Sequence, residues 1–139
     1  MRRQASKAPP IRILLVDDNL AMRKATHRLL NFEPDFKIIG EADNGLDAVA
    51  LVEQYQPEVV IMNYAMPKLD GVEATRRIRQ IAPHTSVIIL SSYDDPHVVD
   101  AAMDAGATSY FVKPVHEIDK FYDAIRFVAT VERDSTART

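Results

Sequence analysis

Polar side chains that could bind a cation or an anion stand at the ends of four apolar runs in this chain. Asp17 and Asp18 close the first run, and Asn63, Ser91 and Lys113 close or follow three later ones. Two adjacent carboxylates beside a third oxygen donor suit a hard cation such as Mg²⁺, which prefers few carboxylates together with water and backbone oxygens. A lysine ammonium is a point charge that can pair with a phosphoryl oxygen. These residue types indicate metal-assisted phosphate chemistry, provided that the fold brings them together.

The elements that must position these side chains are five short apolar runs rich in Ile and Val. The runs are Ile11 to Val16, Phe36 to Ala42, Glu58 to Asn63, Ser86 to Leu90 and Thr108 to Val112. Several lack strict alternation, as expected for parallel strands covered on both faces. Helical patterns separate the runs, so the chain predicts an α/β fold, a doubly wound (βα)5 five-stranded parallel sheet between two helical layers. Ligands of such sheets bind outside the carboxyl ends of the strands, where the polar side chains should therefore meet.

The helical stretches show apolar spacing and recognisable ends. Three sets of side chains show helical spacing, and the last of them is assigned to the core: Ala48, Val49, Val52 and Tyr55; Val72, Thr75, Ile78 and Ala82; and Ile118, Tyr122, Ile125 and Ala129. Asn44-Gly45, Asp70-Gly71 and Asp95-Pro96 predict helix starts, and Gly106 predicts a helix end. The basic run Arg76-Arg77-Ile78-Arg79 is interpreted as a solvated helix face with Ile78 in the core, in preference to a nucleic-acid site.

Composition is typical of one acidic domain. The chain has 139 residues, 47% of them hydrophobic, which is enough for one well-buried core. A formal net charge of −3 offers no global attraction to nucleic acid or anionic lipid, and the absence of cysteine excludes disulfides and thiolate chemistry. No stretch has the pattern of a secretory signal or a membrane span, so we expect a cytoplasmic protein without a membrane partner. We predict a flexible basic arm over residues 1–10, one domain over 11–131 and a polar tail or linker stump over 132–139.

The order and spacing of these features resemble the receiver domain of bacterial two-component response regulators, whose fold is CheY-like and flavodoxin-like. The resemblance spans roughly Ile11 to Thr130 and includes the segments from Ala65 to Gly71 and from Asp104 to Ala107. Two further stretches are similar to the NarL-like, or LuxR-type, subfamily: Phe36 to Ala42 and Ser91 to Asp95. Its members usually continue into a helix-turn-helix domain. The chain stops at Thr139, so either an effector domain was removed or this is a stand-alone receiver, and DNA would be contacted only through such an effector.

The resemblance implies a strand order of 2-1-3-4-5 and a metal site. Asp17, Asp18, the side chain of Asn63 and the backbone carbonyl of Ala65 would hold Mg²⁺. A sensor histidine kinase would supply the phosphoryl group, and the domain itself would not be an enzyme.

The resemblance also assigns roles to three residues on the last two strands. Lys113, followed by Pro114 through a cis peptide bond, would pair with a phosphoryl oxygen. Ser91 would be the switch hydroxyl, and Tyr110 would be the aromatic partner that rotates inward behind it.

Asn63 departs from the family, which carries aspartate at the phosphoacceptor position. A carboxylate can attack phosphorus to give an acyl phosphate, whereas the neutral amide is a far poorer nucleophile. Asparagine is nearly isosteric and keeps one acceptor oxygen, so the fold and a weakened Mg²⁺ site should survive. The replacement, engineered or natural, predicts a receiver that cannot be phosphorylated. The alternative is a natural pseudo-receiver that acts as a phosphate-independent interaction or dimerisation module.

Simpler interpretations exist for the individual residues. Asp17-Asp18-Asn19 would only cap the first helix, and Lys113-Pro114 would be an edge lysine before a proline that stops the strand. A flavodoxin-like FMN binder shares the topology, but Asp17 and Asp18 would repel the phosphate. The histidines have no metal-ligand spacing and are expected to face solvent: His27, His84, His97 and His116.

The last helix predicts a partner surface. With Ile118 and its companions assigned to the core, Phe127 lies on the opposite side of the helix and should face water. Val131 follows one turn later. Together with the neighbouring Asp123, these residues predict a homodimer contact or, failing that, a surface on which an effector docks.

Overall fold

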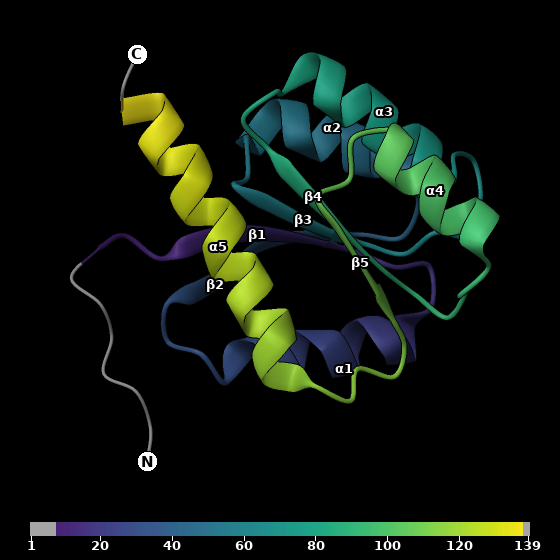
Figure 1. Cartoon of the computed structure of the whole chain (residues 1–139), viewed down its shortest axis with the longest axis horizontal. Coiled ribbons are helices and arrows are strands. Elements are labelled where there is room, and N and C mark those ends of the chain that lie inside the picture. Colours follow the sequence, from purple (N-terminus) through teal and green to yellow (C-terminus); the bar gives the residue numbers. More distant parts are fainter. Residues whose placement is uncertain (1–7, 138–139) are drawn as a thin grey trace.

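The computed structural model describes residues 8–137, which form a five-stranded parallel sheet with helices on both faces (Figure 1). The strands are β1 (Ile11–Val16), β2 (Phe36–Ala42), β3 (Val59–Met62), β4 (Ser86–Ser91) and β5 (Ser109–Val112), and the helices are α1 (Leu20–Asn31), α2 (Gly45–Tyr55), α3 (Gly71–Ile81), α4 (Pro96–Asp104) and α5 (Ile118–Ala137). The strand order β2-β1-β3-β4-β5 and the fold class are as predicted. Each predicted strand limit lies within one residue of the observed limit.

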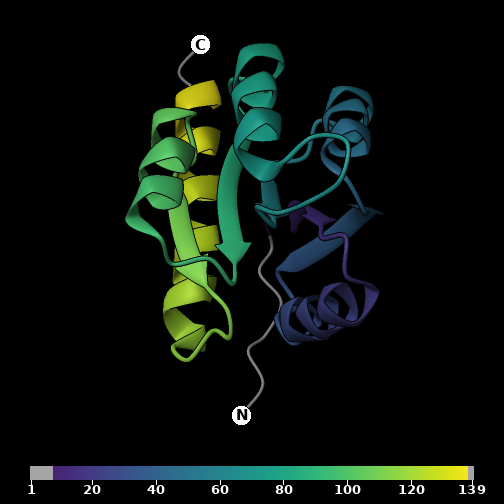
Figure 2. The same cartoon turned by 90° about the vertical axis from the view of Figure 1, so that its right-hand side faces the viewer.

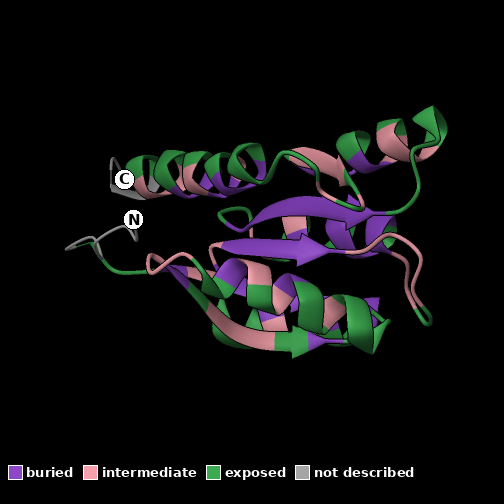
Figure 3. Cartoon of the chain, turned by 90° about the horizontal axis from the view of Figure 1, so that it is seen from below, coloured by how far each residue is buried: buried purple, intermediate pink, exposed green. Residues whose placement is uncertain are grey.

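Two apolar layers hold the helices against the sheet. Helices α2, α3 and α4 pack on one face, where Val52, Ile78 and Ala102 are fully buried. Helices α1 and α5 pack on the other face through Leu30 and Phe121. Every residue of β3 and β4 is buried, which explains their continuous apolar sequence (Figure 3). In Figure 2, α4 lies in front of β5 and α5 behind it, on opposite faces of the sheet.

The predicted helix ends are confirmed by their capping geometry. Asn44, Asp70 and Asp95 each accept a hydrogen bond from a backbone N–H in the first turn of the helix that follows. Gly106 follows the end of α4 with a φ of 111°, which a residue with a Cβ rarely adopts. In the basic run of α3, Ile78 is fully buried and the two preceding arginines are exposed, as expected.

The predicted core face of α5 is partly wrong. Tyr122, Ile125 and Ala129 are buried as expected, but Ile118 is 39% exposed. Ile118 is the first residue of the helix, and the buried face of the helix begins three residues later, at Phe121. The remaining core positions are Phe121 and Val128, and the Phe121 ring packs edge-on against Phe111 of β5 at 5.3 Å. Tyr55, the last residue of the predicted helical pattern in α2, lies at the end of that helix and is 45% exposed.

Helix α5 also runs through Ala137, past the predicted end of the domain at residue 131. Two arginines anchor it. Arg126 pairs with Asp35 through two bonds of 2.8 and 2.9 Å and stacks on the Phe36 ring. Arg133 binds both carboxylate oxygens of Glu58, at 2.6 and 2.7 Å, so this residue of the predicted polar tail is tied to the residue before β3. The arm predicted over residues 1–10 lies largely outside the described residues.

None of the helices within residues 8–137 is long and apolar enough to cross a membrane.

Close backbone packing fixes the loop that carries Asn63. The first residue of α3, Gly71, donates its N–H to the Tyr64 carbonyl at 2.7 Å. A Cβ at position 71 would lie 2.2 Å from the Asn63 carbonyl oxygen and 3.0 Å from the Tyr64 Cα. Only glycine therefore lets α3 approach the end of β3 this closely.

Gly71→Ala is expected to lower the free energy of unfolding by about 3 kcal/mol, because backbone must move to admit the methyl group. Gly40→Ala is the matched control, since its Cβ would meet only a Leu14 methyl group at 3.4 Å. It should change stability by less than about 1 kcal/mol. Urea unfolding of both variants measures this, and equal losses would show that the Asn63 loop does not require glycine.

Candidate site at the carboxyl edge of the sheet

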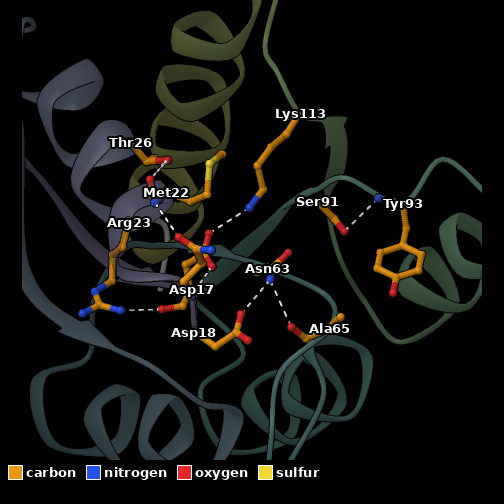
Figure 4. A network of polar contacts seen from close by, with 11 residues as sticks. Asp17, Asp18, Met22, Arg23, Thr26, Asn63, Ala65, Ser91, Tyr93 and Lys113 are labelled. Atoms are coloured by element: carbon orange, nitrogen blue, oxygen red, sulfur yellow. Dashed lines mark hydrogen bonds and ion pairs between the residues drawn. The ribbon is translucent and has the colours of Figure 1, made fainter.

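The five polar residues predicted to meet do lie at one edge of the sheet. Asp17 and Asp18 follow β1, Asn63 follows β3, Ser91 is the last residue of β4, and Lys113 follows β5. Since β1, β3, β4 and β5 are consecutive neighbours in the sheet, their carboxyl ends form a continuous row. Figure 4 shows the side chains of Lys113, Asp17, Asp18 and Asn63 directed toward one another.

Asp17 and Lys113 form a nearly buried ion pair. The Lys113 Nζ lies 2.8 Å from the Asp17 Oδ2, and the two side chains are 10% and 6% exposed. The other carboxylate oxygen of Asp17 accepts the Asn19 N–H at 2.9 Å. Buried charges are tolerated when both paired and hydrogen-bonded, and both conditions hold here. The pair also links the β1–α1 loop to the β5–α5 loop, since Lys113 and Asp17 belong to different loops.

The carboxamide of Asn63 joins the β1–α1 loop to the β3–α3 loop. Its Nδ2 donates to the Asp18 Oδ1 and to the Ala65 carbonyl, both at 3.1 Å. A carboxylate and a carbonyl can only accept hydrogen bonds, so the amide must turn its nitrogen toward them. Two of the groups predicted to hold a metal, Asp18 and the Ala65 carbonyl, thus accept hydrogen bonds from Asn63.

Asn19 supplies the cap of α1. Its side chain accepts the Met22 N–H at 3.0 Å, which confirms the capping interpretation for this residue. The carboxylates of Asp17 and Asp18 make their bonds to other partners, so capping and site formation fall to different residues of one loop. The peptide bond between Lys113 and Pro114 is cis, as expected.

Ser91 and Tyr110 lie together with Tyr93. Ser91 is fully buried, and its Oγ accepts the Tyr93 N–H at 3.2 Å. The Tyr110 hydroxyl donates to the Tyr93 carbonyl at 2.6 Å. Burial raises the pKa of Tyr110 above its ordinary value, and the Ser91 hydroxyl acts in the opposite direction. The two residues predicted to form the switch therefore meet the same segment after β4.

Sequence reasoning missed four residues around the site: Tyr64, Tyr93, Arg23 and Glu41. The Tyr64 ring packs edge-on against the Tyr93 ring at 5.3 Å, and this contact joins the loops after β3 and β4. Arg23 of α1 donates to the Asp17 carbonyl at 2.6 Å and pairs with Glu41 at 3.0 Å. The only sequence signal for Tyr64 was its position directly after Asn63.

The histidines take no part in this site. His84, His97 and His116 are exposed as expected, while His27 is half-buried and lies 3.1 Å from Glu41. Among residues 8–137, no group of three or more His, Cys, Asp or Glu side chains could hold a metal ion.

Comparison with known proteins decides the family. Residues 13–126 match the response regulator receiver domain. This chain belongs to that family. A curated relative, the transcriptional regulatory protein DegU of Brevibacillus brevis, is 38% identical over 86% of the chain and 50% of its own length. This result favours a receiver over an FMN binder of the same topology.

Solved structures support the NarL and LuxR subfamily. The signal receiver domain of the putative response regulator NarL from Mycobacterium tuberculosis has a TM-score of 0.80 and 28% identity, covering 86% of this chain and 98% of that one. A LuxR-family DNA-binding response regulator from Staphylococcus aureus has a TM-score of 0.79 and 30% identity with the same two coverages.

The receiver spans about half the length of curated relatives such as DegU. Receiver domains generally bind Mg²⁺ at their acidic site, interact with histidine kinases and are not themselves enzymes. The two relatives named above are a transcriptional regulatory protein and a DNA-binding response regulator.

Proposed function

We propose that this receiver takes its signal from a sensor histidine kinase in a two-component system, and that its acceptor position cannot be phosphorylated. The proposal is carried by one observation, an amide at the carboxyl edge of the sheet beside Asp17 and Asp18, which is called the acidic edge below. Asn63 stands between Asp18 and the Ala65 carbonyl, where the family places its acceptor aspartate. The other residues that the resemblance assigns to the site lie at the same edge of the sheet: Asp17, Asp18, Ser91 and Lys113.

The bonding of Asn63 adds a reason why it cannot act as a nucleophile. An acyl phosphate forms when a carboxylate oxygen attacks phosphorus. The amide nitrogen has no free lone pair, since it is conjugated with the carbonyl, and its two N–H groups already donate to oxygen acceptors. Lys113, which would neutralise a transferred phosphoryl group, is held by Asp17.

Incubation with Mg²⁺ and acetyl phosphate should add no phosphoryl mass to this chain, whereas Asn63→Asp should gain one base-labile phosphoryl group. Intact-protein mass spectrometry before and after alkaline treatment measures both. Asn31→Asp is the matched control, because Asn31 is exposed on α1 and outside the site. Stoichiometric base-labile labelling of the unmodified chain would contradict the proposal.

A second function is a phosphate-independent interaction module, which uses the same fold without phosphoryl transfer. The observation that favours it is the bonding of Asn63, since an amide already engaged at both N–H groups leaves the site with no reacting group. Replacement of Asn63 by Asp separates the two functions in cells. If the chain is a receiver that has only lost its acceptor, the Asn63→Asp variant should regain output that depends on the kinase. If it is a constitutive module, the output of the variant should be the same with and without the kinase.

Mg²⁺ should bind this receiver more weakly than its aspartate form. Asp17, Asp18, the Asn63 Oδ1 and the Ala65 carbonyl would hold the ion only if the Asn63 amide rotated to present its oxygen. That rotation breaks both hydrogen bonds of the amide. The amide also brings one negative charge fewer than aspartate.

Calorimetric titration with Mg²⁺ should give an affinity roughly tenfold or more below that of Asn63→Asp, which corresponds to at least about 1.4 kcal/mol. Asn31→Asp, with the same charge change outside the site, should bind Mg²⁺ as the unmodified chain does. Equal affinities for the unmodified chain and Asn63→Asp would contradict the expected weakening.

The exposed face of α5 supports a homodimer. Phe127 is 70% exposed and Val131 is 47% exposed. Both line a groove of about 570 Å³ that also includes Asp123 and reaches the start of β4 at Ser86. A projecting ring beside a groove is self-complementary, since two copies related by a twofold axis can each insert Phe127 into the other. No direct DNA contact is proposed for this domain.

Phe127→Ser should weaken self-association about tenfold or more, because a central aromatic often dominates such an interface. Sedimentation over a range of concentrations measures this. Phe32→Ser is the matched control, because Phe32 is 71% exposed but follows α1. Identical association of Phe127→Ser and the unmodified chain would leave Phe127 as ordinary surface.

A further inference from the structure

Four of the oxygens that a cation could use at this edge already take part in a hydrogen bond or an ion pair. Both carboxylate oxygens of Asp17 are engaged, one by Lys113 and one by the Asn19 N–H. The Asp18 Oδ1 and the Ala65 carbonyl both accept from Asn63. The residues present therefore do not fit a metal without breaking several bonds that now satisfy one another.

We propose that the Asn63 carboxamide takes the place of the divalent cation, so that this receiver assembles its acidic edge without metal. The inference rests on the proposed function, because it concerns the same site. The Asn63 nitrogen contacts two oxygens at 3.1 Å that come from different loops, as a bridging ion would. Its two N–H groups carry partial positive charge and face the Asp18 carboxylate and the Ala65 carbonyl.

Electrostatics explains why the amide can do this and aspartate cannot. With aspartate at position 63, two carboxylates would face each other across the loops, and like charges at this distance repel unless a cation separates them. With asparagine, the negative charge of Asp18 receives a hydrogen-bond donor directly. Hydrogen bonds to a charged acceptor are stronger than those between neutral groups.

A second contact completes the metal-free assembly. The Lys113–Asp17 pair fastens the β5–α5 loop to the β1–α1 loop, as Asn63 fastens the β3–α3 loop. Ser91 and Tyr110 lie outside both contacts and bond to Tyr93 instead. The state of the acidic edge is therefore fixed by side chains of the chain itself, and Mg²⁺ concentration should not change it.

Thermal unfolding in EDTA and in excess Mg²⁺ tests the proposal. The Tm of the unmodified chain should agree within about 1 °C in the two conditions. The Tm of Asn63→Asp should be lower than that of the unmodified chain in EDTA and rise by roughly 4 °C or more with Mg²⁺. Asn31→Asp has the same added charge outside the site and should show no rise. A rise for the unmodified chain equal to that of Asn63→Asp would overturn the proposal.

A double-mutant cycle tests the bond itself. Asn63→Ala and Asp18→Ala should each lower the Tm in EDTA, and the double variant should fall by less than the sum of the two losses. Asn31→Ala serves as the control for an amide outside the site. Strictly additive losses would overturn the proposal. If instead Asn63→Asp neither binds Mg²⁺ nor accepts a phosphoryl group, the proposed receiver function fails. The proposal of a metal-free edge is then decided by the melting of the unmodified chain and by the double-mutant cycle.

Discussion

Two adjacent carboxylates at the end of a buried strand each accept a bond from a donor on another loop, and the rest of this site depends on these two pairings. Asp17 is buried and takes the ammonium of Lys113. Asp18 is more exposed and takes the amide of Asn63. The parallel sheet makes both pairings possible, because it brings the ends of β1, β3 and β5 to one edge although they are distant in sequence. Neither pairing requires an ion or a phosphoryl group.

The site has two parts that a phosphoryl group would normally connect: the loops after β1, β3 and β5, and the segment after β4. The loops after β1, β3 and β5 are joined by Asn63 and Lys113. The segment after β4 is organised by Tyr93, which binds both Ser91 and Tyr110 and touches Tyr64. The Tyr64–Tyr93 ring contact and the hydrogen bond from the Lys113 N–H to the Ser91 carbonyl, at 2.8 Å, link the two parts.

The sequence predicts the fold well because apolar runs and capping residues are local signals. The strand limits, the caps at Asn44, Asp70 and Asp95, and the gathering of the polar residues follow from them. Side-chain faces near element ends are less predictable, as Ile118 and Tyr55 show, since burial there depends on how far the sheet extends. The anchoring of the last turns by Arg133 depends on Glu58, which is distant in sequence.

The orientation of Asn63 is the part of the site that sequence could not supply. The residue type indicates an acceptor oxygen available for a metal. The structure instead directs the nitrogen inward, because two acceptors from separate loops converge on it. Which atom faces the site is decided by these neighbours, and they are known only once the loops have been placed.

Nuclear magnetic resonance of the Asn63 side-chain amide tests the central claim most directly. In ¹⁵N-labelled protein, the Nδ2 protons should exchange with solvent more slowly than those of exposed Asn31, and their resonances should stay in place as Mg²⁺ is added. Rapid exchange equal to that of Asn31, or a large Mg²⁺-dependent shift of the Asn63 amide, would contradict the account.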